Sequence, residues 1–255
     1  MPRIDQLVDL TTRHKLLSFM DAFSEYNQIL MDEDDQKNTS FVTSQRLYCY
    51  KIMPFGLKNV GATYQRLVNC MFFHWIRRNV EVYVDDMLVK SKDEANHLDD
   101  LKETFSTLRK YNMKLNPAKC VFAVASGKFL GFIVSQRGIE ANPNKVKVII
   151  EVKSPKIVKE VQSLTGKVIA LNRFVSKATD KCMPFFKVLR KAFQWTNECK
   201  EAFAKLNDYL TKPPLLNPSM MGEKLYLYLA VSNTIVSSTL IKEEGNVQKP
   251  IYYTS

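Results

Sequence analysis

The chain has 255 residues, of which 37 are Lys or Arg and 26 are Asp or Glu, giving a formal net charge of +11. This length permits a sizeable core and two or three subdomains, and the positive excess favours a polyanionic partner. Five cysteines without a Cys-x-x-Cys spacing argue against a disulfide framework or a zinc ribbon, and no apolar run is long enough to span a membrane.

The N-terminal half alternates short apolar strands with amphipathic helices. Residues 16–23 form an apolar strand that carries a single carboxylate, Asp21. Residues 61–78 repeat apolar side chains at helical spacing, and residues 93–111 do so again with acids first and bases last, as a helix dipole prefers. Strands are expected near residues 120–124 and 129–134. Hairpins whose helices pack on one face indicate an α+β fold.

Two adjacent acids interrupt a strand pattern at residues 80–89. Val80, Val82 and Val84 alternate, Asp85 and Asp86 follow, and the apolar pattern then resumes, which predicts a hairpin with both carboxylates at its turn. Neighbouring buried carboxylates are costly to ionise, so such a pair favours a divalent metal such as Mg²⁺ or Mn²⁺. From this pair alone, an ordinary hairpin turn is an equally good interpretation.

The other two Asp-Asp pairs serve as internal comparisons. Asp34-Asp35 lies in a polar stretch and Asp99-Asp100 on a charged helix, so both are interpreted as solvated surface acids. Asp21 adds a third carboxylate at the end of a neighbouring strand. Three acids on two adjacent strands suit a pair of metal ions about 4 Å apart, the arrangement used for displacement at phosphorus.

The C-terminal half is basic and then turns to strands. Residues 145–191 contain twelve Lys or Arg and three acids, and apolar residues recur at three- and four-residue spacing across 157–175, which predicts helices. A solvated helical bundle is the plainer interpretation of such lysines. Another helix is expected at 196–210, a boundary at Pro213-Pro214, and strands at 224–229 and 232–241.

Several motifs in order resemble the reverse transcriptase of gypsy-type LTR retrotransposons (the Metaviridae). They are Pro2-Arg3-Ile4-Asp5, Met20-Asp21-Ala22-Phe23-Ser24-Glu25-Tyr26, Met53-Pro54-Phe55-Gly56-Leu57-Lys58-Asn59, Ala62-Thr63-Tyr64-Gln65-Arg66, Tyr83-Val84-Asp85-Asp86, Phe129-Leu130-Gly131-Phe132-Ile133-Val134-Ser135 and Gly138-Ile139. A later stretch, Leu164-Thr165-Gly166 with Leu171-Asn172-Arg173-Phe174, is similar to the plant Tat-like branch. The resemblance covers essentially the whole chain.

The resemblance implies roles for three carboxylates and one aromatic residue. Asp21, Asp85 and Asp86 match the catalytic ligands of two Mg²⁺ ions, for which Mn²⁺ is a possible substitute. Tyr26 matches the aromatic residue that excludes the 2′-hydroxyl of a ribonucleotide. Without the resemblance, an ordinary core tyrosine would be the favoured interpretation.

Five further positions carry roles implied in the same way. Phe55 and Gly56 match the loop lining the nucleotide pocket, and Tyr83 precedes the paired acids as a nucleotide-binding position. Leu130 and Gly131 match the hairpin that grips the primer end. Glycine within a strand pattern fits close backbone approach, and a simple bulge is the alternative.

The resemblance also implies a domain order. We expect a palm at 1–140 with its fingers largely missing, a helical thumb and connection at 141–212, and a truncated RNase H-like domain at 213–255. Its Tyr-x-Asp-Ala-Ser motif is Tyr228-Leu229-Ala230-Val231-Ser232 here, so Ala230 replaces the metal-binding aspartate and RNA cleavage is expected to be absent.

Two functions remain open from the sequence. The first is an RNA-directed DNA polymerase core acting on an RNA or DNA template, a DNA primer and deoxynucleoside triphosphates. Other retrotransposon polyprotein domains are possible partners. The second is a non-catalytic relic that only binds nucleic acid. Asp21, Asp85, Asp86 and Tyr26 favour the first, whereas the missing fingers and Ala230 favour the second.

Overall fold

The computed structural model describes residues 1–190, 194–220, 222–233 and 235–255, which divide into two compact units. Unit 1 comprises residues 1–130 and 134–136, and unit 2 comprises residues 131–133 and 137–255. The elements from the N-terminus to β7 are α1 (Ile4–Thr11), β1 (Leu16–Asp21), η1 (Glu25–Gln28), α2 (Glu33–Lys37), β2 (Phe41–Val42), β3 (Leu47–Tyr48), α3 (Val60–Met71), β4 (Val80–Tyr83), β5 (Asp86–Ser91), η2 (Glu94–Asn96), α4 (His97–Lys110), η3 (Pro117–Lys119), β6 (Val121–Val124) and β7 (Ser126–Phe129).

The main sheet of unit 1 has the order β4-β5-β1-β6. The pairs β4·β5, β5·β1 and β1·β6 are all antiparallel, so consecutive side chains point to opposite faces. One face carries Met20, Val82, Met87 and Val89, which belong to one buried apolar cluster. Asp21 and Asp86 lie on the opposite face.

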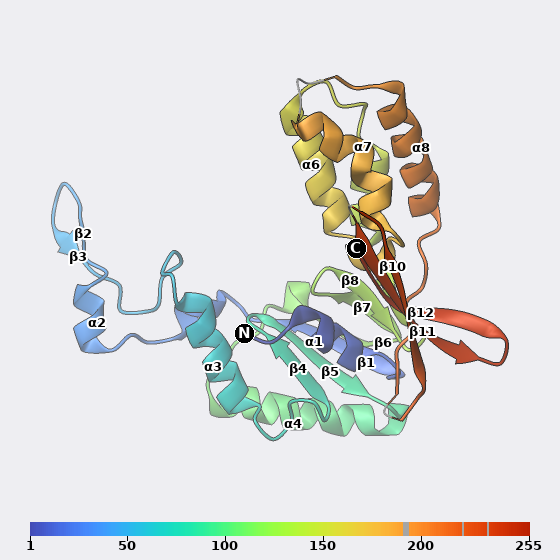
Figure 1. Cartoon of the computed structure of the whole chain (residues 1–255). Helices are drawn as coiled ribbons and strands as arrows, with labels where there is room; N and C mark the ends of the chain where they lie inside the picture. Colours follow the sequence, from blue (N-terminus) through green and yellow to red (C-terminus); the bar gives the residue numbers. More distant parts are fainter. Residues whose placement is uncertain (191–193, 221, 234) are drawn as a thin grey trace. The chain divides into compact units, whose positions relative to one another are not determined.

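Helices cover both faces of this sheet (Figure 1). Helices α3 and α4 supply Tyr64, Val68, Met71, Leu101 and Leu108 to the cluster that includes the strand residues above. These side chains are spaced three, four or seven residues apart, so each helix buries one stripe and exposes the opposite side. Helix α1 lies against the other side, where the Leu10 carbonyl accepts a hydrogen bond from Lys90 of β5.

A buried hydrogen-bond network fixes the strands to α4. His97 lies 2.7 Å (Nε2) from the Ser18 hydroxyl of β1 and 2.8 Å (Nδ1) from the Ser91 hydroxyl of β5. Ser18 also accepts the backbone N–H of Ala123, whose φ of 53° marks an irregularity in β6. The network satisfies polar groups that burial would otherwise leave unpaired.

The remaining elements, apart from the end of β8, belong to unit 2. The chain leaves unit 1 through the small sheet β7-β8-β9. The elements from there onward are β8 (Phe132–Ser135), β9 (Gly138–Ala141), α5 (Pro143–Ile150), α6 (Val158–Ile169), η4 (Asn172–Phe174), α7 (Ala178–Arg190), α8 (Asn197–Thr211), β10 (Leu225–Val231), β11 (Val236–Glu244) and β12 (Val247–Thr254). Helices α6 to α8 and η4 contribute buried apolar side chains, namely Val161, Leu164, Val168, Phe174, Phe185, Leu206 and Leu210. No described helix is long and apolar enough to cross a membrane.

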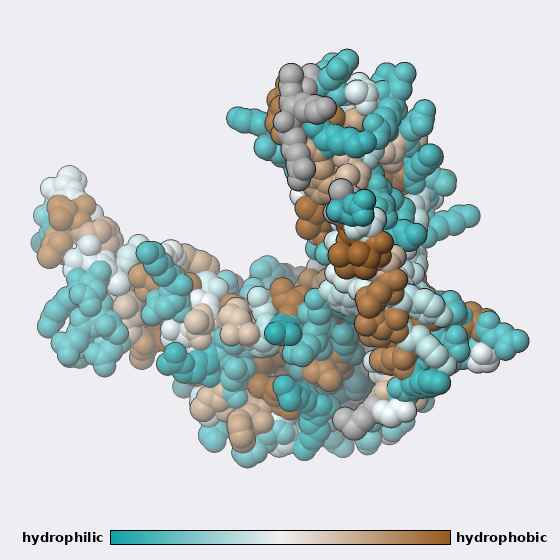
Figure 2. Space-filling view, in the orientation of Figure 1, coloured by the Kyte–Doolittle hydropathy of each residue, from teal (hydrophilic) through white to brown (hydrophobic). Residues whose placement is uncertain are grey.

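The C-terminal sheet has the order β10-β11-β12 and is antiparallel throughout. Its strand β10 is apolar yet exposed: Leu227, Leu229 and Val231 retain 60%, 67% and 75% of their accessible surface. Brown residues gather over this part of unit 2 in the view of Figure 2. Ala230, where the resemblance would place an aspartate, pairs with Ser237 of β11.

Three expectations about local structure are wrong in detail. The strand predicted at 232–241 is found as β11 at Val236–Glu244. The helix predicted at 61–78 ends at Met71, because the chain folds into tight turns in which Trp75 donates to Thr107 of α4. The strand predicted at 129–134 is broken after Phe129. Leu130 and Gly131, with φ of 50° and 85°, form a two-residue turn between β7 and β8, since both adopt the left-handed region that suits such hairpins.

Candidate metal-binding carboxylate site

Three carboxylates gather at one end of the main sheet. Asp21 of β1 is directly opposite Asp86 of β5 in the antiparallel register. Asp85 lies in the turn between β4 and β5, and its carbonyl accepts the backbone N–H of Ala22 at 3.3 Å. Register and turn therefore bring acids 64 and 65 residues apart in sequence onto one edge.

The turn that presents Asp85 and Asp86 has an unusual backbone. Val84 adopts a φ of 52°, a left-handed conformation that β-branched residues rarely take. Its N–H donates to the side-chain oxygen of Gln65 at 2.8 Å, and the Gln65 amide donates to the Val82 carbonyl at 3.3 Å. Gln65 is buried on α3. The helix thus holds the turn in a conformation that would otherwise be strained.

The electrostatics of the site are strongly negative. Burial, followed by the charges of Asp85 and Asp21, raises the pKa of Asp86 to about 6, and Lys119 partly opposes this shift. Desolvation and the nearby like charges both disfavour the ionised form of Asp86. A cation at this edge would relieve the repulsion.

One cation of the chain already lies at the site. The Lys119 ammonium donates to the Asp21 carboxylate at 3.2 Å. This hydrogen bond and the Asp21 charge raise the pKa of Lys119, with smaller contributions from Asp85 and Glu25. Lys119 ends the short helix η3, 98 residues after Asp21 in the chain.

Tyr26 belongs to an aromatic group in the same unit as the carboxylates. The Tyr26 ring meets Phe55 edge-on at 5.1 Å and Tyr64 edge-on at 5.7 Å between centroids. Burial, with a smaller contribution from the Asp85 charge, raises the pKa of Tyr26, and Tyr64 shifts in the same direction for the same leading cause. The Asp85 contribution indicates that both hydroxyls lie within its field.

The other positions for which the resemblance implies nucleotide binding lie in the same unit. Phe55 is 60% exposed, and Gly56 has a φ of 99° at a position where an added Cβ would meet nothing within 4 Å. The glycine is needed there for its backbone conformation rather than for close packing. Tyr83 ends β4 directly opposite Asp86.

Leu130 and Gly131 form a separate group at the division between the two units. In unit 2, a Cβ added to Gly131 would come within 2.6 Å of the Lys145 ammonium. A side chain would therefore displace Lys145, and the positive φ of Gly131 disfavours one independently.

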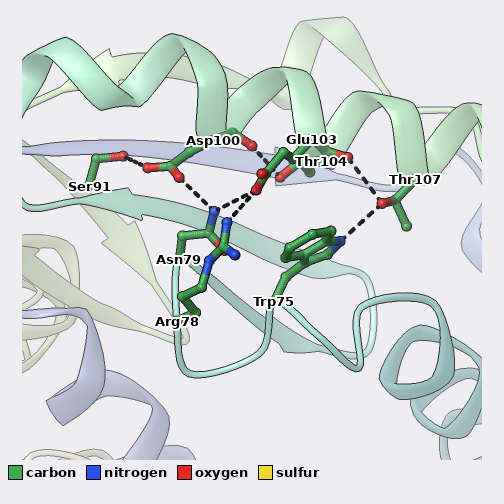
Figure 3. Close-up of polar contacts among 8 residues, drawn as sticks. All are labelled: Trp75, Arg78, Asn79, Ser91, Asp100, Glu103, Thr104 and Thr107. Atoms are coloured by element: carbon green, nitrogen blue, oxygen red, sulfur yellow. Dashed lines mark hydrogen bonds and ion pairs between the residues drawn. The ribbon is translucent and has the colours of Figure 1, made fainter.

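The comparison acids behave differently from one another. Asp34 is fully solvated, with 93% of its side chain exposed. Asp100 is not the solvated acid that the sequence predicts: it accepts hydrogen bonds from Ser91 at 2.5 Å and from Asn79 at 2.7 Å (Figure 3). Asp99, at 75% exposure and paired with Lys102, remains a suitable solvated control.

The donor set fits a hard divalent cation. All three site acids offer carboxylate oxygens, which suit Mg²⁺ or Mn²⁺ better than soft metals. In the described part of the chain, no three His, Cys, Asp or Glu side chains are arranged to hold a metal as they stand. The chemistry and placement of Asp21, Asp85 and Asp86 fit, while their present conformation includes the ion pair with Lys119.

An α+β unit with carboxylates at one edge of an antiparallel sheet defines the palm class of nucleic-acid polymerase folds. Residues 1–134 match the family model "Reverse transcriptase (RNA-dependent DNA polymerase)", and residues 195–255 match "RNase H-like domain found in reverse transcriptase". The chain belongs to the reverse transcriptase family.

Its curated relatives are transposon polyproteins. The retrovirus-related Pol polyprotein from transposon 412 of Drosophila melanogaster is 30% identical over all of this chain and 21% of its own length. The transposon Tf2-3 polyprotein of Schizosaccharomyces pombe is 26% identical over all of this chain and 19% of its own length. The chain thus spans about a fifth of the length of these relatives.

Solved structures share the fold. A foamy viral protease-reverse transcriptase in complex with double-stranded DNA aligns over 100% of this chain and 45% of its own, with a TM-score of 0.87 and 22% identity. The same viral enzyme in complex with an RNA/DNA hybrid aligns over 97% of this chain and 34% of its own, with a TM-score of 0.84 and 23% identity.

Two residues at the site were given no role from the sequence. Gln65 is a polar residue within the buried stripe of a predicted helix. A polar side chain among apolar ones indicates a specific hydrogen-bonding role, so the sequence could have identified it. Lys119 carries no such signal, because nothing in the local sequence indicates that η3 returns to Asp21.

Proposed function

We propose that this chain is the RNA-directed DNA polymerase core of a retrotransposon polyprotein. The supporting observation is the pairing of Asp21 with Asp86, with Asp85 in the adjoining turn. Asp21, Asp85 and Asp86 would hold two Mg²⁺ ions, which when bound activate a primer 3′-hydroxyl and neutralise the triphosphate. The chain itself positions these ligands. The register of β1 against β5 places Asp21 opposite Asp86, and the hydrogen bond from Val84 to Gln65 holds the turn that carries Asp85.

The substrates follow from the same assignment. Tyr26, Phe55, Gly56 and Tyr83 would contact a deoxynucleoside triphosphate, and Leu130 with Gly131 would contact the primer end. A Tyr26 ring fixed between Phe55 and Tyr64 supports a steric role, since it cannot easily move aside for a 2′-hydroxyl. With this steric role for Tyr26, Tyr26→Ala should raise ribonucleotide incorporation relative to deoxynucleotide incorporation by about tenfold or more.

The partner would be an RNA or DNA template annealed to a DNA primer. Exposed lysines on and between α5 and α6 support this, and so do the nucleic-acid complexes of the structural neighbours. Arg173, by contrast, is 3% exposed and packs against Tyr252, so it is excluded from any phosphate-binding surface. Residues 1–140, 141–212 and 213–255 would serve as palm, thumb and RNase H-like domain.

We further propose a gypsy-type element of the plant Tat-like branch, on the stretches at residues 164–166 and 171–174. Sequencing the genomic DNA around the coding region tests this proposal. Flanking long terminal repeats and further polyprotein domains are expected, and a host gene without repeats would contradict it.

Primer extension on the full chain tests the polymerase assignment. With an RNA template, a DNA primer and Mg²⁺, Asp85→Asn and Asp86→Asn should each reduce extension by two orders of magnitude or more, because a metal ligand and its charge are lost together. Asp99→Asn should change it less than twofold, since Asp99 is a solvated acid. Duplex binding without any extension would instead support the binding-only alternative.

A further inference from the structure

The ion pair between Lys119 and Asp21 joins an exposed side chain to a largely buried one. The Lys119 side chain is 61% exposed, whereas that of Asp21 is 16% exposed. Exposed ion pairs are individually weak and exchange readily with water. The ammonium can therefore leave for solvent, while the carboxylate cannot.

The backbone that carries Lys119 is tied to Asp21 itself. The Asn116 N–H donates to the Asp21 carbonyl at 2.9 Å, and Leu115 bridges to Ala22. The Asn116 side chain accepts the Ala118 N–H at 3.2 Å and so starts η3. The attachment point of Lys119 is thus fixed beside the site, and only its flexible side chain needs to move.

The charge balance leaves room for a divalent ion. When ionised, Asp21, Asp85 and Asp86 carry three negative charges against the single positive charge of Lys119. A lysine ammonium is a compact point charge on a flexible stem. It contacts a carboxylate oxygen of Asp21 that a metal ion would also use.

We propose that Lys119 is an internal counter-ion that occupies Asp21 in the metal-free chain and must be displaced when a divalent metal ion binds. This inference rests on the proposed metal-binding role of the three aspartates. Lys119 neutralises part of the negative charge at Asp21 before metal arrives and lowers the apparent metal affinity. On metal binding its ammonium moves into solvent but stays near the carboxylates, because its backbone remains attached beside Asp21.

Mn²⁺ binding to the full chain, followed by electron paramagnetic resonance of the free ion, tests this role without any activity assay. Lys119→Gln should bind Mn²⁺ about threefold or more tightly, because a competing positive charge is removed. Lys114→Gln is the matched control, since it makes the same charge change at an exposed lysine five residues earlier. It should alter affinity less than twofold, and Lys119→Arg should not bind more tightly than the unaltered chain.

Affinity in Lys119→Gln that equals or falls below that of Lys114→Gln would overturn the inference. Asp21→Asn and Asp86→Asn separate this failure from a failure of the proposed function. If both aspartate variants lose Mn²⁺ binding while Lys119→Gln has no effect, only the counter-ion role is wrong. If neither variant weakens binding, the metal site itself is wrong. Thermal unfolding of each metal-free variant confirms that it is folded.

Discussion

The side-chain oxygen of Gln65 lies 2.8 Å from the backbone nitrogen of Val84, the residue that begins the turn carrying Asp85. This contact joins α3 to a turn whose φ of 52° a valine would not adopt unaided. The geometry of the carboxylates therefore depends on a residue that carries no charge.

Removing that acceptor should loosen the turn. Gln65→Met keeps the side-chain volume but leaves the buried Val84 N–H unpaired, so the free energy of unfolding should fall by about 1–3 kcal/mol. Urea unfolding measures this, and primer extension should fall in parallel. Gln162→Met, on the exposed side of α6, is the control and should cost less than about 0.5 kcal/mol. Equal losses in the two variants would remove the support for this role.

Asp86 should make stability depend on pH in a defined direction. Its folded pKa of about 6 lies above the ordinary value of 3.8, so the native state holds a proton that the unfolded chain releases between pH 4 and 6. Its stabilising effect is present below pH 4 and is lost as pH rises through 6.

The substitution Asp86→Asn should therefore raise stability at pH 7 but not at pH 4. The expected gain at pH 7 is about 1 kcal/mol, discounted because the side chain is only partly buried. Thermal unfolding at both pH values measures it, with Asp99→Asn as the solvated control. A gain of the same size at pH 4 and pH 7 would contradict the assignment.

A buried ion pair joins β4 to β5, the two strands that flank the turn carrying Asp85. The Lys90 ammonium donates to Glu81 at 2.8 Å, and the two side chains are 2% and 0% exposed. Lys90→Met alone should destabilise the chain by about 3–5 kcal/mol, because the buried Glu81 carboxyl would lose its ion-pair partner. Combining it with Glu81→Leu should recover most of that loss, and a simple sum of the two single effects in urea unfolding would argue against coupling.

Duplex binding should weaken steeply with salt. Lys153 and Lys156 are exposed between α5 and α6, and neutralised phosphates release counterions. Lys153→Gln with Lys156→Gln should reduce the slope of log affinity against log salt by up to about 2, at roughly 0.9 per phosphate contact. Lys37→Gln with Lys102→Gln removes the same charge from unit 1 and should leave the slope nearly unchanged. Fluorescence anisotropy with an RNA–DNA duplex measures both.

Much of unit 1 was predictable because its signals are local. Period-two alternation around Asp85 and Asp86 predicted the hairpin, and helical spacing predicted α3 and α4. The early end of α3 was not predictable, because Trp75 leaves the helix to reach Thr107 of a later helix. Periodicity indicates which side chains are buried, and a turn buries Phe72 and partly buries Trp75 here, as a helix would.

The site was predictable only in part for a related reason. Asp85 and Asp86 are adjacent, and Asp21 ends its own apolar strand, so the local sequence marks each of the three as a candidate site residue. The hydrogen bonds of Asp100 to Ser91 and Asn79 come from two other elements, and helix α4 alone gives no sign of them (Figure 3). The same holds for Lys119, whose contact with Asp21 depends on tertiary structure.

Because Asp21 pairs directly with Asp86, the proposed metal chemistry depends on the register of β1 against β5. A slip of β1 by one residue against β5 would turn Asp21 to the face of α3 and α4, and a slip of two would move it by nearly 7 Å along the strand. Deletions within β1 or β5 should therefore abolish function even where the sheet re-forms. In mutational surveys, single-residue gaps in these strands should be tolerated less well than substitutions of their core residues.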